Sequence, residues 1–348
     1  MKLRALLAGC AAFLMLTGCA ASGAEETERT FFAMDTVMQV RVFGDGGEEA
    51  VQAVCDEVQR LESLLSRTQP ESDITRLNQS AGGGTWVALD GETAEVLDMA
   101  LRYGEETGGA FDVTIAPVMD AWGFGTSEEE YRVPDGTELA ALLPLVDSGL
   151  LTLDRENSSA RLETAGMEVD LGGIAKGYAA DRAKAVLEEA GITSALLNLG
   201  SSTVGLVGGK PDGSPWRIAV RDPADESASL GTLALTDCSV STSGGYERYF
   251  EADGVIYHHI LDPETGYPAE KGLLSVTVVT DDGSRADAWS TALYVMGAEE
   301  ALSFWRQSGD FECILCRSDG TVQVTEGLEE AFTAEEDGNG YTFEIVRR

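Results

Sequence analysis

The chain has 348 residues, and its 60 acidic residues against 24 lysines and arginines give a formal net charge of −36. This acidity argues against nucleic acid as a partner, since a phosphate backbone needs a positive surface, and against a basic membrane-binding face. Hydrophobic residues make up 43% of the chain, which excludes a disordered or collagen-like protein and leaves one large or two modest domains.

The N-terminus has the pattern of an export signal. Lys2 and Arg4 precede an apolar run at 5–16 that is too short to span a bilayer comfortably, and the run ends in Leu16-Thr17-Gly18-Cys19. This resembles a bacterial lipoprotein signal, whose Cys is lipidated after cleavage; an ordinary signal peptide or a plain anchor is the alternative. We therefore expect an extracytoplasmic protein, anchored to the cell membrane by lipid. The expected divisions are a signal peptide at 1–18, the lipidated Cys19, a flexible tether at 19–30 and a folded domain at 31–348.

The hydrophobic pattern then predicts a mixture of helices and strands. The first half should contain a strand at 34–43, amphipathic helices at 48–66 and 93–106, a polar, turn-rich excursion with short strands at 125–165, and a helix at 173–190. Strands should follow at 195–199, 216–220, 232–235, 255–261 and 274–280. The chain should end with helices at 286–296 and 298–307 and two short strands with an acidic turn at 335–337. This order predicts an α+β fold with a largely antiparallel sheet, in one domain or in two entwined subdomains.

Four cysteines remain beyond the signal segment and Cys19. Two of them, Cys313 and Cys316, have the CxxC spacing that serves redox or metal chemistry in some proteins. The residues around them are typical of a strand, where positions three apart point to opposite faces. We therefore expect Cys313, Cys316, Cys55 and Cys238 to be small buried hydrophobic residues.

Histidine is scarce, because the chain contains only His258 and His259. Any histidine acid or base must be one of these two. They precede the strong turn signal at 262–266, and on a strand one imidazole points inward and the other outward. The residues alone leave open whether this is a site or a surface strand with incidental histidines.

Asp287 and Thr291 are four residues apart, so on a helix they share one face. A carboxylate and a hydroxyl are hard oxygen ligands that suit Mg²⁺, which completes its coordination with phosphate and water. The alternative is ordinary: Asp is favoured in the first turn of a helix by the helix dipole, and Thr simply packs.

Three turn segments could line a ligand groove or could be ordinary loops. At 170–181 a glycine-rich turn leads into a helix, and Lys176 adds a positive charge where exposed backbone N–H groups could bind an anion. The spacing matches neither a Walker loop nor a dinucleotide fingerprint. The segments at 198–202 and 239–248 combine small hydroxyl residues with glycines.

Taken together, these segments resemble the bacterial FAD:protein FMN transferases, the ApbE family. The match is collinear from about Met34 to Gly297. Its motifs are Met34-Asp-Thr36, Ser72-Asp-Ile-Thr-Arg-Leu-Asn78, Gly109-Ala-Phe-Asp112-Val-Thr114, Trp122-Gly-Phe-Gly125, Asp170-Leu-Gly-Gly-Ile-Ala-Lys-Gly-Tyr-Ala-Ala-Asp181, Asn198-Leu-Gly200, Thr242-Ser-Gly-Gly-Tyr-Glu-Arg248, His259-Ile-Leu-Asp-Pro-Glu-Thr-Gly266 and Ala286-Asp287-Ala-Trp-Ser-Thr291-Ala.

The resemblance implies an α+β flavin transferase domain at 31–348, with FAD in a groove between two subdomains. It implies Mg²⁺-dependent transfer of FMN from FAD to a Thr or Ser hydroxyl of a target flavoprotein, with AMP released. By motif, the implied Mg²⁺ ligands are Asp287, Thr291 and the carbonyl of Ala175, and the implied catalytic residues are His259 and Asp287. The residues implied to border FAD are Met34, Ala175, Lys176, Asp181, Asn198, Gly200, Thr242, Ser243, Gly244 and His259.

Two departures from the family pattern are visible. The family often has a second glycine and then Asp or Asn after Gly200, whereas this chain has Ser201 and Ser202. The first motif has Asp35 where Gly is commoner. The altered loop after Gly200 leaves its ligand contacts open.

Three alternative functions also fit the residues. Water instead of a protein hydroxyl would make the protein a Mg²⁺-dependent FAD pyrophosphatase, and the same ion and base would serve both reactions. A flavin-binding lipoprotein without chemistry and a purely structural surface lipoprotein are the other two, and the joint presence of Asp287, Thr291 and His259 argues against both.

Overall fold

The structure is a computed structural model that describes residues 24–125, 131–335 and 340–348. The expected signal peptide and Cys19 lie outside these residues. Within them, no helix is both long enough and apolar enough to cross a membrane.

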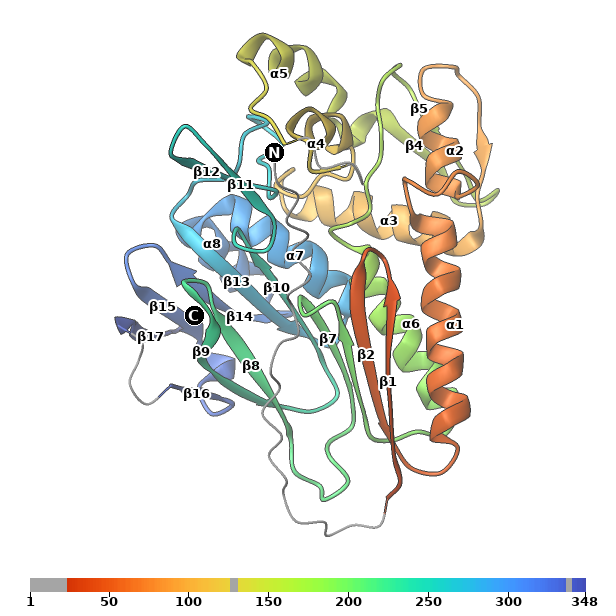
Figure 1. The fold of residues 1–348 in the computed structure, drawn as a ribbon. Coiled ribbons are helices and arrows are strands. Elements are labelled where there is room, and N and C mark those ends of the chain that lie inside the picture. The colour runs from red at the N-terminus through yellow and green to blue at the C-terminus, as the bar shows by residue number, and fades with distance from the viewer. Residues whose placement is uncertain (1–23, 126–130, 336–339) are drawn as a thin grey trace, which may run out of the picture.

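A nine-stranded sheet forms the centre of the molecule (Figure 1). Its strands, in spatial order, are β1 (Glu26–Ala33), β2 (Thr36–Phe43), β6 (Ala195–Leu199), β7 (Thr203–Val207), β10 (Ser239–Gly244), β13 (Leu273–Thr280), β14 (Glu312–Arg317), β15 (Thr321–Thr325) and β17 (Thr342–Val346). Neighbouring strands are antiparallel, apart from the parallel pair β15 and β17. The prediction of a largely antiparallel α+β fold is confirmed.

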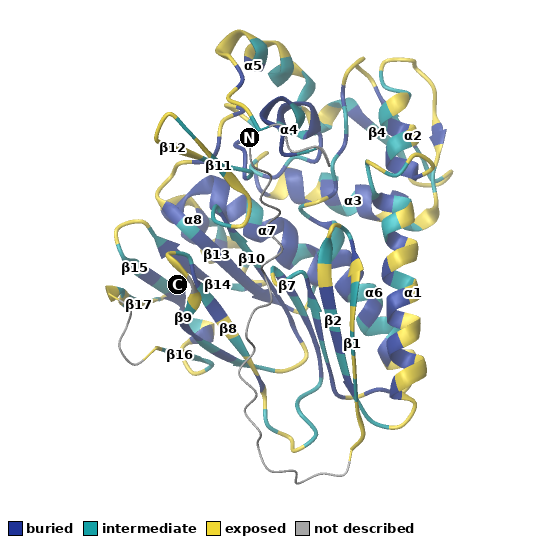
Figure 2. Cartoon of the chain, in the orientation of Figure 1, coloured by how far each residue is buried: buried dark blue, intermediate teal, exposed yellow. Residues whose placement is uncertain are grey.

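Helices cover one face of this sheet. They are α1 (Gly47–Leu65), α3 (Gly91–Glu106), α6 (Ala175–Glu189), α7 (Gly283–Met296) and α8 (Ala298–Ser308). The outer face of α1 is exposed, while α7 is buried along nearly its whole length (Figure 2). Because α7 is surrounded by protein, a polar side chain on it needs partners inside the molecule. This is the helix on which Asp287 and Thr291 lie.

A smaller sheet covers the other face of the central sheet. It consists of β16 (Phe332–Ala334), β9 (Asp225–Leu235) and β8 (Trp216–Asp222). The predicted opposite orientation of Cys313 and Cys316 on β14 is confirmed, because Cys313 packs in the core under the helices and Cys316 in the core under the small sheet. Burial raises the pKa of Cys316 to about 12, so its thiol stays protonated at neutral pH. Cys55 and Cys238 are also buried free thiols, as predicted.

A third group of elements lies beside the ends of the central strands. It contains α2 (Asp73–Gln79), α4 (Ala116–Trp122), α5 (Gly136–Leu142), the short 3₁₀ helices Leu143–Leu145 and Ser148–Leu150, and the three-stranded sheet of β3 (Val87–Ala88), β5 (Ser159–Leu162) and β4 (Leu151–Asp154). The hairpin of β11 (Tyr249–Ala252) and β12 (Val255–His258) packs its aromatic residues against Trp122. A last 3₁₀ helix spans Glu326–Leu328.

The tether prediction is wrong for residues 26–30, because β1 begins at Glu26 and pairs with β2 along its full length. Alternate residues of β1 are half-buried against the molecule while the others face solvent. Such an edge strand has a polar composition, so its sequence looks like a linker. Sequence periodicity also gave no signal for the seven-residue helices α2, α4 and α5.

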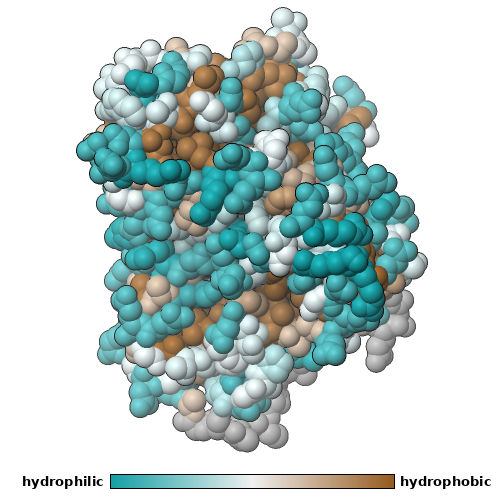
Figure 3. All heavy atoms as spheres, turned by 180° about the vertical axis from the view of Figure 1, so that it is seen from behind, coloured by the Kyte–Doolittle hydropathy of each residue, from teal (hydrophilic) through white to brown (hydrophobic). Residues whose placement is uncertain are grey.

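Hydrophilic residues cover most of the face seen from behind (Figure 3). Elsewhere on the molecule, α1 also exposes carboxylates such as Glu48 and Glu49 to solvent. The strong acidity of the chain is therefore largely solvated rather than buried, as charged surfaces of soluble domains usually are.

Candidate active site between α6 and α7

The helices α6 and α7 meet at a pair of glycines. A Cβ at Gly177 would lie 2.1 Å from the carbonyl oxygen of Gly283, and one at Gly283 would lie 2.6 Å from the carbonyl oxygen of Gly177. The absence of both side chains lets the two helices approach closely. At this contact the backbone N–H of Gly177 donates to Asp287 Oδ2 at 3.0 Å. The close approach thus brings the carboxylate of α7 against the first turn of α6.

Asp287 is 5% exposed and accepts hydrogen bonds from several directions. Besides Gly177, Ser241 Oγ donates to its Oδ1 at 3.0 Å and Thr203 Oγ1 lies 3.4 Å from the same atom. Lys176 Nζ lies 4.0 Å from Oδ2. These backbone and hydroxyl donors hold the carboxylate in one orientation. The site therefore holds a carboxylate group at a defined position.

Thr291 lies one turn further along α7, on the same face. Its Oγ1 is 3.1 Å from Ser243 Oγ, which also contacts Ser290 Oγ at 2.8 Å. A Cβ at Gly173 would lie 3.8 Å from Thr291 Oγ1, so the turn before α6 passes directly beside this hydroxyl. Ala175, the first residue of α6, lies in the chain between Gly173, which passes beside Thr291, and Gly177, which donates to Asp287. The structure thus brings together the three predicted metal-binding positions.

The donor chemistry of these positions fits Mg²⁺. In the described part of the chain, no three His, Cys, Asp or Glu side chains form a group that could hold a metal by themselves. Asp287 is a single carboxylate, Thr291 adds a hydroxyl and Ala175 adds a carbonyl. Mg²⁺ commonly takes one or two carboxylates and keeps its other positions for water and substrate phosphates. The three positions match this coordination preference of Mg²⁺. They do not match the complete set of protein ligands that is typical of a structural metal site.

His259 directly follows β12 and is half-buried. Its backbone N–H donates to the carbonyl of Arg248 at 3.1 Å, and its Nδ1 lies 3.2 Å from the same oxygen. Burial, with the positive charge of Arg248 and a smaller effect of Lys176, lowers the pKa of His259 to about 3. The imidazole is therefore neutral at physiological pH. With Nδ1–H donating to Arg248, Nε2 is the atom left to accept a proton or a hydrogen bond.

His258 points elsewhere, as expected for the neighbouring position on a strand. Its Nε2 lies 3.4 Å from the hydroxyl of Tyr294 on α7, and its Nδ1 accepts from the N–H of Ile260 at 3.3 Å. A Cβ at Gly245 would lie 2.9 Å from both the His258 ring and the Tyr294 hydroxyl. Both ring nitrogens of His258 thus have partners inside the protein, and the side chain supports the loop after β10.

Two tight turns meet at one edge of the sheet. Met34 and Asp35 form the two-residue turn of the β1–β2 hairpin, both with positive φ, at 50° and 57°. Gly200 has φ 77°, and a Cβ there would lie 2.6 Å from the side chain of Thr36. Asn198 Oδ1 accepts from the N–H of Ser201 at 3.0 Å and closes the second turn. Met34, Asn198 and Gly200 are thus brought together as neighbouring turns.

Other predicted residues have different surroundings. Asp181 accepts from the N–H groups of Gly283 and Ser284 at 2.7 and 2.9 Å, so it caps the start of α7, and burial raises its pKa. The hydroxyl of Thr242 contacts Thr277 at 2.8 Å on β13, whereas its neighbours Ser241 and Ser243 contact α7. Gly244 ends β10 where a Cβ would lie 2.4 Å from the Tyr246 ring.

A surface cavity of about 330 Å³ lies beyond Asp181, at the start of α7. Carboxylates dominate its polar lining, among them Glu95, Asp281 and Asp282. Their charge disfavours a ligand that carries phosphates. Asp181 itself lines this cavity, whereas Asp287 and Thr291 do not.

Comparison with known proteins identifies the family. A model described as "ApbE family" matches residues 34–315. The chain belongs to the ApbE family. A relative named "FAD:protein FMN transferase" from Klebsiella pneumoniae (strain 342) is 36% identical over 258 residues, covering 74% of this chain and 78% of that protein. A protein of the same name from Treponema pallidum (strain Nichols) is 33% identical and covers 87% of this chain and 88% of its own length.

Solved structures agree with this family assignment. The crystal structure of the ApbE protein from Thermotoga maritima MSB8 has a TM-score of 0.82 and 32% identity, and the match covers 89% of this chain and all of that one. The apo form of the flavinyl transferase ApbE of Pseudomonas stutzeri has a TM-score of 0.79 and 31% identity, covering 90% and 98%. The ApbE fold expected from the motifs is confirmed.

Two residues of this ApbE site were not identified from the sequence. Thr203 and Ser241 contact Asp287 through their hydroxyls. Ser241 lies two positions before Ser243 on one strand, so the period of two was an available signal. Nothing in the local sequence marks Thr203, because its role depends on the pairing of β7 with β10.

Proposed function

We propose that this protein transfers FMN from FAD to a Thr or Ser hydroxyl of a target flavoprotein, with Mg²⁺ as cofactor and AMP as the leaving group. One observation carries the proposal: a buried carboxylate and a hydroxyl on one face of α7 lie against the glycine-rich first turn of α6. The names of the ApbE relatives support the same reaction.

Asp287, Thr291 and the carbonyl of Ala175 would hold the ion. When bound, Mg²⁺ neutralises charge on the FAD diphosphate and on the departing AMP. Lys176 places a second positive charge 4.0 Å from Asp287. Since phosphoryl transfer depends mainly on positioning and charge neutralisation, these residues supply what the chemistry needs from the protein.

His259 would receive the hydroxyl of the acceptor protein. The hydrogen bond from Nδ1–H to the Arg248 carbonyl fixes the ring and leaves Nε2 free to accept. A neutral imidazole in that tautomer orients the acceptor oxygen toward phosphorus by accepting its hydrogen bond at Nε2, and the hydroxyl proton passes by way of Nε2 to water. Lys176, which lies 4.0 Å from Asp287, is also one of the charges that lower the pKa of His259.

Product analysis tests the proposal. The mature protein is incubated with FAD, Mg²⁺ and an FMN-acceptor domain, and AMP, free FMN and protein-bound flavin are quantified. We expect bound flavin and AMP in equal amounts, and neither with a chelator or with an acceptor whose Thr or Ser is replaced by Ala. Free FMN together with AMP would instead make the protein a pyrophosphatase, and no product would make it a binding protein.

We also propose that Cys19 is lipidated and anchors the protein to the outer face of the cell membrane. The signal-like residues 1–19 support this. In cells, wild-type protein should sediment with membranes and Cys19→Ser should not, whereas Cys55→Ser, a change within α1, should leave the fractionation unchanged. Equal sedimentation of wild type and Cys19→Ser would contradict lipid anchoring.

A further inference from the structure

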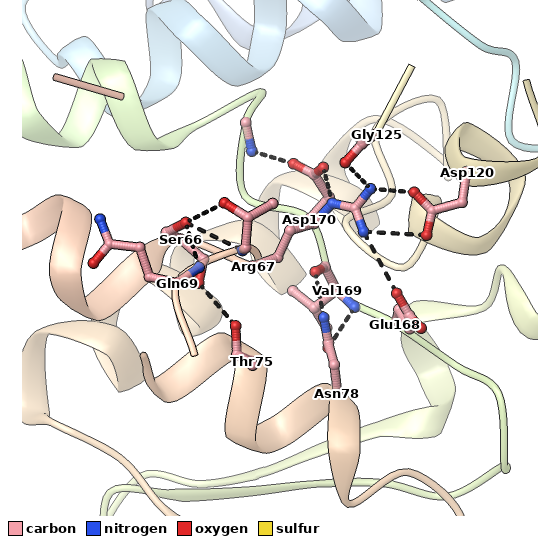
Figure 4. A network of polar contacts seen from close by, with 12 residues as sticks. Ser66, Arg67, Gln69, Thr75, Asn78, Asp120, Gly125, Glu168, Val169 and Asp170 are labelled. Carbon is pink, nitrogen blue, oxygen red and sulfur yellow. Dashed lines mark hydrogen bonds and ion pairs between the residues drawn. The ribbon is translucent and has the colours of Figure 1, made fainter. Parts of the chain in front are cut away.

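Arg67 follows the end of α1, and its side chain is only 10% exposed. Its guanidinium group lies among three carboxylates from two other segments, Asp120 on α4 and Glu168 and Asp170 in the loop before α6 (Figure 4). It also donates to the carbonyl of Gly125 at 2.8 Å. A charge this buried has to be paired, and here the pairing connects distant parts of the chain.

Each nitrogen of the guanidinium has its own direction. Nε lies 2.8 Å from Asp170 Oδ2, Nη2 contacts both Asp120 Oδ1 and the Gly125 carbonyl, and Nη1 lies 3.3 Å from Asp120 Oδ2 and 3.5 Å from Glu168. Only the planar, five-donor fork of arginine can meet these acceptors at once. A lysine could keep the charge but could not span Asp120 and Asp170 together.

Asp170 connects Arg67 to the turn before α6. Its Oδ2 faces Arg67, while its Oδ1 accepts from the N–H of Gly172 at 2.6 Å. The carbonyl of Gly172 in turn accepts from Lys176 Nζ at 3.2 Å, and that ammonium lies 4.0 Å from Asp287. A continuous set of polar contacts therefore runs from Arg67 to the proposed Mg²⁺ site.

The same loop is held from two further sides. Asn78 of α2 makes two hydrogen bonds to the backbone of Val169, at 3.0 and 2.8 Å. The N–H of Asp170 donates to the carbonyl of Val113 at 2.8 Å. These contacts fix the backbone at 169–170, but the contact that reaches forward to Gly172 runs through the Asp170 side chain, which Arg67 orients.

We infer that Arg67 is a positioning residue for the Mg²⁺–diphosphate site: through Asp170 it fixes the turn at 172–174, which presents the Ala175 carbonyl and Lys176. The inference rests on the proposed function. Residues that orient metal ligands from outside typically change metal affinity about 10- to 100-fold when they are replaced. We expect replacement of Arg67 to weaken Mg²⁺ binding, because Arg67 orients the proposed ligands without contacting any of them directly.

The test measures Mg²⁺ affinity without turnover. FAD binding is followed by flavin fluorescence as Mg²⁺ is titrated, with no acceptor protein present, for wild type and Arg67→Lys. We expect the Mg²⁺ concentration at half-saturation to rise at least about 10-fold in Arg67→Lys. In the transfer assay, kcat at saturating Mg²⁺ should recover most of its wild-type value. Asp170→Asn, which removes the charge that Arg67 holds, should reproduce the shift.

Arg60→Lys is the matched control. Arg60 lies on α1 and also joins two carboxylates, Glu57 and Glu92, but it has no contact with the loop at 168–173 among those the structure describes. Its Mg²⁺ half-saturation should stay within about 2-fold of wild type. Wild-type Mg²⁺ affinity in folded Arg67→Lys and Asp170→Asn would overturn the inference, and so would an equal shift in Arg60→Lys. Wild-type FAD binding that ignores Mg²⁺ would instead remove the metal from the proposed function, and the inference with it.

Discussion

Gly177→Ala is the most direct test of how the site is assembled. The new Cβ would lie 2.1 Å from the Gly283 carbonyl oxygen, whereas carbon–oxygen contacts normally lie at about 3.3 Å or more. The helices α6 and α7 must therefore separate locally by about 1 Å. Overpacking of this kind costs about 1–3 kcal/mol, and the better helix propensity of alanine returns up to about 1 kcal/mol. The variant should fold with modestly lower stability.

The effect on activity should be much larger. Asp287 is carried by α7 and Ala175 by α6, so the separation displaces the two proposed ligands relative to each other by about 1 Å, and a misplacement of this size can reduce turnover about 100-fold. The assay is transfer of FMN to an acceptor domain, together with thermal unfolding. Gly91→Ala is the matched control, because Gly91 opens α3 and a Cβ there meets no atom within 4 Å. Wild-type turnover and Mg²⁺ affinity in folded Gly177→Ala would refute this reasoning.

Four further results are expected. Asp287→Asn should lower Mg²⁺-dependent transfer at least about 100-fold. Its melting temperature should change little, because the amide oxygen can still accept from Gly177. Full activity would contradict the metal assignment. His259→Ala should lose transfer and retain FAD binding, and an inactive His258→Ala that binds FAD normally would show that the acceptor meets the other face of the strand. Ser201→Gly should raise the free energy of unfolding by about 1 kcal/mol or less, because Ser201 is exposed and has φ 66°. Urea denaturation would detect this as a higher midpoint, and an unchanged midpoint would show that this turn is unstrained. Because the pKa of His259 is lowered to about 3, its imidazole stays neutral, and kcat should be constant from pH 8 to about pH 5. A fall in kcat centred near pH 6.5 would show that the ring titrates as it does in water. The same lowered pKa leaves stability unaffected above pH 6.5 and reduces it as pH falls from 6.5 toward 3, because only the unfolded chain then protonates this imidazole.

The sequence was informative wherever one local pattern decides the outcome. The helix at 48–66 and the strand at 274–280 were found within one or two residues of α1 and β13, because each has a strong hydrophobic period. The face shared by Asp287 and Thr291 follows from helix geometry alone.

Features that depend on distant segments were not accessible in this way. β1 looks polar because only alternate residues are covered, and the role of Arg67 depends on carboxylates that lie 53 and 101 residues away in sequence. Asp181 was singled out by motif as bordering FAD, and the structure gives it a second task that the motif did not indicate, since its oxygens accept from the first N–H groups of α7. A motif can indicate that a residue is important, but only the packed structure shows which contacts that residue makes.

The contact between Gly177 and Asp287 also has a consequence for how the protein matures. It joins residues 110 positions apart, and the Asn78–Val169 and Thr203–Asp287 contacts join residues 91 and 84 apart. Contacts that close such long loops are made late, after most of the chain has collapsed. The chain therefore acquires the geometry of the proposed Mg²⁺ site only when α7 has docked. Before that step the proposed reaction has no assembled site, so activity and completed folding should coincide.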